Sequence, residues 1–176
     1  MDLSPFDSKD MKWVNEAHEI AEDRVTNFYK FSLGQWKRHP YDVKTLRSLR
    51  DEEITPDAFA LLRKGSRSLS HYELKTKERD FYFICLQDHI IQRALRRDKR
   101  LTLLPLLVYV FTHELVHIVR FCNFSQRFTF PVKGREKEES VVHETTFRVL
   151  KGLSLPRLDY VLEAYRHHRI CDVALC

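Results

Sequence analysis

The sequence predicts an α+β fold in one mostly helical domain with a small antiparallel sheet. A chain of 176 residues is the size of a single domain and can bury a core. Only 4 Gly and 6 Pro are present, so long helices and few linkers are expected. One segment, Asp80–Leu86 (DFYFICL), is rich in aromatic and β-branched residues, which is typical of a strand.

The N-terminal part, residues 1–65, is predicted to be helical. Apolar residues recur there at helical spacing until His39 and Pro40 interrupt the pattern. A residue before proline disfavours helical backbone, so a break is expected at that point. The predicted helices are about Asp10–Trp36, about Val43–Arg50, and one that Thr55 caps, Pro56 opens and Gly65 ends.

The rest of the domain is predicted to hold a hairpin and then helices. Residues 66–152 contain the hairpin and two long helices, and residues 153–176 contain a C-terminal helix. Ser68–Lys75 and Asp80–Leu86 form the hairpin arms around the polar turn Thr76–Arg79. A further strand is expected at about Arg127–Val132. The predicted helices are about Asp88–Arg97, Leu103–Phe121, Glu136–Leu150 and Pro156–His168.

Composition narrows the choice of partners and compartment. The net charge of +5 permits nucleic-acid contact, but the densest basic run, Arg93–Arg100, has no interleaved aromatic residues, so such binding is weakly supported. The four cysteines show no CxxC spacing and the N-terminus has no apolar signal region, so a cytoplasmic location is expected. The apolar run Leu101–Phe111 is shorter than the ~18–20 residues of a membrane span, which favours a buried helix and no membrane partner.

The strongest chemical signal is the run HELVH, which contains His113, Glu114 and His117. On a helix the two histidines lie one turn apart on one face, where they can share one ion. Zinc accepts neutral imidazole nitrogen, and a metal would partner polar groups that are costly to bury. Glu114 points about a quarter-turn aside, where its carboxylate can take a proton from a zinc-bound water. We therefore predict a Zn²⁺ site with two histidine ligands and Glu114 as catalytic base.

A third ligand is expected on the following helix, because hydrolytic zinc sites commonly use three protein ligands and keep one position open. On a helix, Glu139 and His143 share a face with Val142 and other apolar residues, so both point toward the core. We favour Glu139 as the third ligand. His143 would then have a supporting catalytic role, hydrogen-bonded to a ligand histidine or to substrate. The alternative is His143 as the third ligand, with Glu139 outside the site.

Two motifs resemble those of the zincin metallopeptidases, and among them the gluzincin branch. That branch has HExxH on one helix and a glutamate on a following helix, often as ExxxD; here the runs are His113–His117 and Glu139–His143. The spacing is similar to that of small ImmA/IrrE-like peptidases. The resemblance covers about residues 103–150 and implies that the two histidines of HELVH and Glu139 bind zinc, that Glu114 is the base, and that a small sheet lies beside the active-site helix. The family often has Asp where this chain has His143.

These observations predict a zinc metallopeptidase that cleaves peptide bonds with a zinc-bound water activated by Glu114. The expected substrate is a specific intracellular protein or peptide. One alternative is a zinc amidase or deacylase that acts on a small molecule. Another is a non-catalytic, zinc-stabilised module that binds protein or nucleic acid, which would need no base at Glu114 and would be closed by a fourth protein ligand. The oligomeric state is left open.

Overall fold

The computed structural model describes residues 3–66, 80–123 and 132–166. In this part of the chain the fold is mostly helical with a three-stranded sheet, which confirms the α+β class. Two short 3-10 helices lie between the first two strands. The elements are α1 (Ser8–Tyr29), α2 (Leu33–Arg38), β1 (Tyr41–Lys44), η1 (Leu46–Ser48), η2 (Asp51–Glu53), β2 (Ala60–Ser66), β3 (Asp80–Leu86), α3 (Asp88–Arg97), α4 (Leu103–Asn123), α5 (Val132–Leu150) and α6 (Leu158–Tyr165).

The sheet is mixed, so the prediction of an antiparallel sheet is wrong in part. Its strand order is β1-β3-β2, with β1 parallel and β2 antiparallel to the central β3. The predicted strand Asp80–Leu86 is confirmed as β3. Its antiparallel partner is Ala60–Ser66, whereas the predicted hairpin arm Ser68–Lys75 lies outside the described residues.

The first predicted helix is two helices. A capping box of Asp7 and Asp10 starts α1, which ends where Lys30 adopts the left-handed conformation at φ 54°. A second capping box, formed by Ser32 and Gln35, starts α2. The left-handed backbone at Lys30 and the S-x-x-Q capping box divide the predicted Asp10–Trp36 helix.

The two shorter helices predicted within residues 1–65 are wrong. Tyr41–Lys44 and Ala60–Ser66 are strands, because pairing with β3 and burial of Leu62 against Ile84 outweigh the local capping signals. β2 also continues across position 65, where the helical N-terminal part was expected to end. Residues 1–65 therefore contribute two of the three strands.

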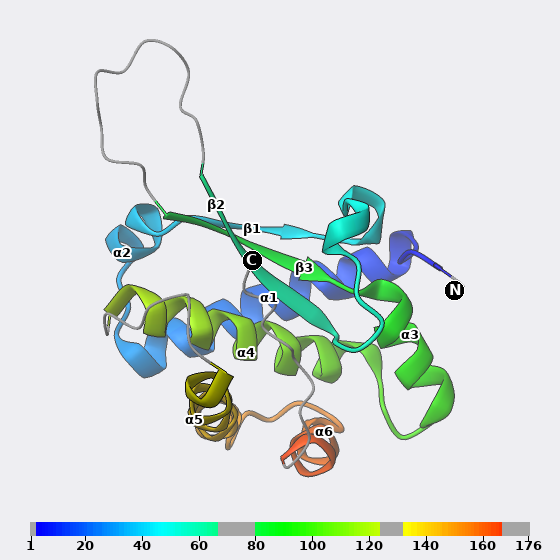
Figure 1. The fold of residues 1–176 in the computed structure, drawn as a ribbon. Helices are drawn as coiled ribbons and strands as arrows, with labels where there is room; N and C mark the ends of the chain where they lie inside the picture. Colours follow the sequence, from blue (N-terminus) through cyan, green and yellow to red (C-terminus); the bar gives the residue numbers. More distant parts are fainter. Residues whose placement is uncertain (1–2, 67–79, 124–131, 167–176) are drawn as a thin grey trace.

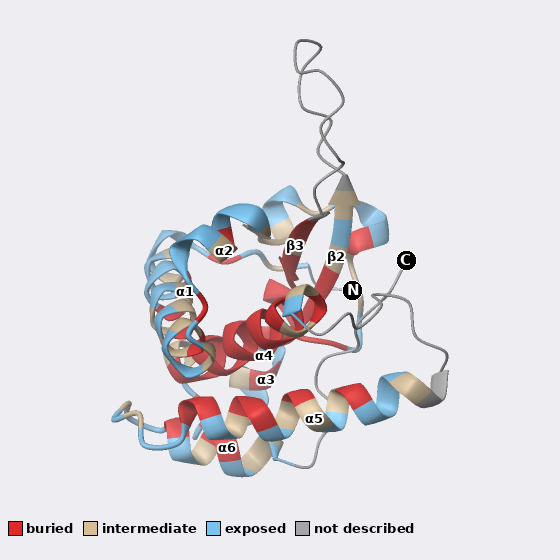
Figure 2. Ribbon diagram, turned by 90° about the vertical axis from the view of Figure 1, so that its left-hand side faces the viewer, coloured by how far each residue is buried: buried red, intermediate tan, exposed pale blue. Residues whose placement is uncertain are grey.

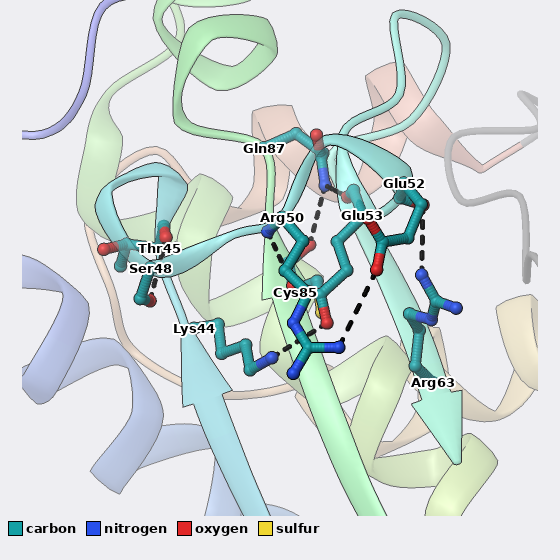
Figure 3. Close-up of polar contacts among 9 residues, drawn as sticks. All are labelled: Lys44, Thr45, Ser48, Arg50, Glu52, Glu53, Arg63, Cys85 and Gln87. Carbon is teal, nitrogen blue, oxygen red and sulfur yellow. Dashed lines mark hydrogen bonds and ion pairs between the residues drawn. The ribbon is translucent and has the colours of Figure 1, made fainter. Parts of the chain in front are cut away.

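A network of hydrogen bonds, here called the Gln87 network, fixes the end of β3 to η2 (Figure 3). The side chain of Gln87 donates to the backbone oxygens of Glu53 (2.8 Å) and Cys85 (3.2 Å) and accepts from Thr55 N (3.0 Å). The carboxylate of Glu53 accepts from Lys44 Nζ (2.8 Å) and from Arg50 N (2.9 Å). Both side chains are thus buried with their polar atoms satisfied.

The helix α4 is the centre of the fold. The sheet lies on one side of it and α5 and α6 on the other, while α1 packs along it (Figure 1). Figure 2 shows that α4 is buried along most of its length. By length and composition α4 is apolar enough to cross a membrane, but 83% of its most apolar window is buried inside this fold.

The remaining helices follow the predictions with shifted ends. α3 has the predicted bounds, and α4 runs two residues beyond Phe121. α5 starts four residues before Glu136, and α6 starts at Leu158 because Arg157 before it adopts the left-handed conformation. The predicted strand Arg127–Val132 falls on residues that are not described, except that Val132 begins α5.

Candidate metal centre

The structure brings the predicted site residues together between α4 and α5. His113, Glu114 and His117 lie on α4, and Glu139 and His143 lie on α5, which packs against it. The two α4 histidines and Glu114 are at most 1% exposed. α4 is buried because its apolar residues face every neighbouring element, so these three polar groups lie in the core.

The two histidines of α4 and the carboxylate of Glu139 meet at one point. His113 Nε2 lies 3.2 Å from His117 Nε2. Glu139 Oε2 lies 3.3 Å from His113 Nε2, and Glu139 Oε1 lies 3.2 Å from His117 Nε2. The three residues predicted as ligands thus lie next to one another, and their role as zinc ligands stays a prediction.

These spacings fit a tetrahedral zinc ion. Ligand atoms about 2.0–2.1 Å from a metal at tetrahedral angles lie about 3.3–3.4 Å from one another. The separation of 3.2 Å between the two Nε2 atoms is close to such an edge, and each histidine lies 3.2–3.3 Å from a different oxygen of the Glu139 carboxylate. The donor set of two imidazoles and one carboxylate is also one that zinc accepts.

His143 lies beside this cluster and is a fourth candidate ligand. Its ring centroid is 4.6 Å from that of His113. The ligand atoms of His113, Glu139 and His143 all lie within 4.8 Å of one another. The structure therefore places both candidate third ligands, Glu139 and His143, beside His113, whereas the alternative prediction put Glu139 outside the site.

A hydrogen bond with Tyr109 orients the ring of His143. The Tyr109 hydroxyl lies 2.9 Å from His143 Nδ1, which leaves Nε2 as the other ring nitrogen. This Nε2 is buried and makes no hydrogen bond with any described residue. The same is true of Nδ1 in both His113 and His117. A buried ring nitrogen without a partner is costly, and of these three only His143 Nε2 could contact an ion held at Nε2 of His113.

The protonation of the cluster suits a cation. Burial lowers the pKa of His113 to about 4, so its imidazole is neutral at pH 7. Burial alone would lower the pKa of His117, but hydrogen bonding to Glu139 outweighs burial and raises it. Burial likewise opposes ionisation of Glu139, yet hydrogen bonds from both histidines hold its pKa below the usual range. A metal ion would displace the proton that His117 and the Glu139 carboxylate share.

Glu114 lies in the same buried region. Its carboxylate is fully buried, and its charge contributes to the raised pKa of His117. Glu114 is thus close enough to His117 to act on its charge, and it is not among the grouped ligand atoms. This is the placement expected of a proton acceptor beside a metal site.

Sequence reasoning missed three residues around the centre. Tyr109 contacts His143, and Arg120 on α4 forms an ion pair with Glu138 on α5. Tyr109 precedes His113 by four residues and Arg120 follows His117 by three, so helical spacing alone could have placed both on the metal-facing side.

Searches of known protein families, curated proteins and solved structures gave no match.

Proposed function

We propose that this chain is a zinc-dependent metallopeptidase of zincin-like fold. The observation that carries the proposal is the convergence of His113, His117 and Glu139 at 3.2–3.3 Å, with Glu114 buried beside them. The three-stranded sheet on one side of α4 supports the comparison with zincins. Within this proposal the protein acts on a specific protein or peptide substrate in the cytoplasm.

The roles of the chain's own residues follow from their placement. His113, His117 and Glu139 hold the ion. When bound, zinc lowers the pKa of a coordinated water and polarises a carbonyl oxygen. Glu114 takes a proton from the attacking water and delivers it to the leaving amine. His143, oriented by Tyr109, directs Nε2 toward the reacting carbonyl.

The test compares the wild type with Glu114→Gln after loading with zinc. We expect one zinc per chain in both proteins and a loss of cleavage of about 10²–10⁴-fold in the variant. Cleavage is measured by mass spectrometry on a peptide library drawn from whole-proteome digests. Glu144→Gln on the exposed face of α5 is the matched control and should cleave normally. Equal cleavage by Glu114→Gln and the wild type would sink the proposed mechanism.

The same assay distinguishes two other candidate functions. A zinc amidase or deacylase would cleave acylated or amidated small substrates and leave the peptide library intact. A non-catalytic zinc module is favoured by one observation, the buried Nε2 of His143, which can act as a fourth ligand and close the site. It would bind zinc tightly and cleave neither set of substrates.

A further inference from the structure

An ion pair joins the two metal-site helices directly beside the proposed ligands. Arg120 Nε donates to Glu138 Oε1 at 2.6 Å, and Arg120 Nη2 donates to Glu138 Oε2 at 2.8 Å. The pairing is bidentate and largely shielded, with side-chain exposures of 15% and 7%. Such a planar two-point contact fixes direction as well as distance, which a single point charge would not do.

The position of this pair relates it to the metal centre. Arg120 is one helical turn beyond His117, and Glu138 is the residue before Glu139. Consecutive residues on an α-helix point about 100° apart. Two adjacent carboxylates on α5 therefore face different partners, one toward Arg120 and one toward the histidines.

A third helix supports the pair. Tyr29, the last residue of α1, interacts through its hydroxyl with the side chains of Thr145 and Arg120. Burial raises the pKa of Tyr29, so the hydroxyl stays neutral, and its oxygen accepts from the Arg120 guanidinium. The contact connects α1, α4 and α5 at one end of the metal centre.

We propose that Arg120 and Glu138 are positioning residues for the metal centre. By occupying the carboxylate of Glu138, Arg120 sets the rotation of α5 about its axis and makes Glu139 the carboxylate that faces His113 and His117. A rotation of α5 by one residue would exchange the two glutamates and break the bidentate pair. This inference rests on the proposed zinc site and explains which of two neighbouring glutamates serves it.

The test measures zinc affinity of Glu138→Gln by competition with a fluorescent chelator. Loss of a group that orients a metal ligand typically lowers metal affinity about 10–100-fold, and we expect a loss in that range. The visible absorption bands of the Co²⁺-loaded protein should also shift, because the ligand geometry changes. A role in stability alone would leave those bands unchanged.

The matched control is Glu53→Gln, which makes the same substitution at an ion pair outside the metal centre. Glu53 pairs with Lys44 at 2.8 Å and its side chain is 8% exposed, close to the 7% of Glu138. We expect this variant to lose stability and keep the wild-type zinc affinity and Co²⁺ spectrum. Arg120→Lys, which keeps the charge and loses the two-point contact, gives a second measurement if Glu138→Gln does not fold.

The outcomes separate this inference from the proposed function. Wild-type zinc affinity within twofold in Glu138→Gln and in Arg120→Lys, with an unchanged Co²⁺ spectrum, overturns the positioning role and leaves the zinc site intact. A wild-type protein that binds neither Zn²⁺ nor Co²⁺ overturns the proposed function itself. Weaker zinc binding in the metal-centre variants with normal binding in Glu53→Gln supports the inference.

Discussion

Two buried polar clusters in this chain differ in how their atoms are satisfied. In the Gln87 network both carboxylate oxygens of Glu53 and both polar atoms of the Gln87 side chain have hydrogen-bond partners (Figure 3). In the histidine cluster, formed by His113, His117, Glu139 and His143, three ring nitrogens are buried without a hydrogen bond to any described residue.

From this difference we predict a structural role for the Gln87 network and an ion-binding role for the histidine cluster. A satisfied network is closed: its donors and acceptors are matched within the chain, and it fixes the strand end in place. In the histidine cluster, Nε2 of His113, Nε2 of His117 and the Glu139 carboxylate lie 3.2–3.3 Å apart, and the unpartnered Nε2 of His143 lies on a ring beside them, so an added cation could be held by these groups. Changes in the histidine cluster should therefore act on metal binding, and changes in the Gln87 network on stability.

The largest effect is expected from removing a zinc ligand, and it also decides between the two ligand sets. Structural zinc sites contribute about 10–16 kcal/mol in total, so each of three protein ligands accounts for about 3–5 kcal/mol, or at least about 100-fold in affinity. We expect Glu139→Gln to lower zinc affinity by at least that factor, and His143→Gln to lower it less, within the roughly 10–100-fold typical of groups beside the ligands. Chelator competition measures both.

The control for this pair is Glu144→Gln, which lies on the exposed face of the same helix and should bind zinc as the wild type does. A larger loss for His143→Gln than for Glu139→Gln would assign His143 as the third ligand. Similar large losses for both would indicate a closed site with four protein ligands, and the comparison would then favour the non-catalytic module.

The second prediction concerns metal removal. Zinc at 100 times its dissociation constant should stabilise the folded chain by about 2.7 kcal/mol, because it binds the folded state. For a domain of this size that corresponds to an increase in Tm of about 5–10 °C, measured by calorimetry with and without chelator. Glu53→Gln should keep the whole shift, whereas His117→Ala should lose it. An equal shift in His117→Ala would mean that the ion binds elsewhere.

Local spacing explains why parts of the fold and site could be predicted from sequence. A long apolar run with HELVH inside it fixes both the central helix and the face that the two histidines share. The helical spacing of Glu139 and His143 likewise placed them toward that face. The presence of zinc stays a prediction.

The predictions that were wrong or missing concern contacts between distant segments of the chain. β1 is four residues long, and it is a strand because it pairs in parallel with Tyr82–Cys85, about 40 positions away. No local pattern in YDVK signals this pairing. The pairing of Arg120 with Glu138 was also missed, because helical spacing places Arg120 on the His117 side of α4 but only the packing of α4 on α5 brings Glu138 to it.

The third prediction concerns the Gln87 network. Gln87→Leu keeps a similar volume but leaves Thr55 N and the backbone oxygens of Glu53 and Cys85 without the side-chain partner. We expect the free energy of unfolding to fall by about 2 kcal/mol, because buried polar groups lose their hydrogen bonds. Urea unfolding of the metal-free protein measures this change.

Zinc affinity should stay unchanged in Gln87→Leu, since the network is closed and has no role at the metal centre. Gln92→Leu is the control: it removes one exposed hydrogen bond, to Pro5 O, and should change stability by no more than about 0.5 kcal/mol. A weakened zinc site in Gln87→Leu would show that the two clusters are coupled and that the contrast between them is wrong.

The smallest effect is expected from acid, and it tests whether Glu53 is an ionised member of the closed network. Burial would raise the pKa of Glu53, but hydrogen bonds from Lys44 and from Arg50 N outweigh it, so the folded-state pKa lies below the ordinary value of 4.5. A depressed carboxyl pKa adds stability above 4.5 that is lost as the pH falls toward the folded-state value. The free energy of unfolding should therefore decline less steeply from about pH 5 to pH 3 in Glu53→Gln than in the wild type. Exposed Glu52→Gln should follow the wild-type curve, and identical acid profiles for Glu53→Gln and the wild type would mean that Glu53 gains nothing from its partners.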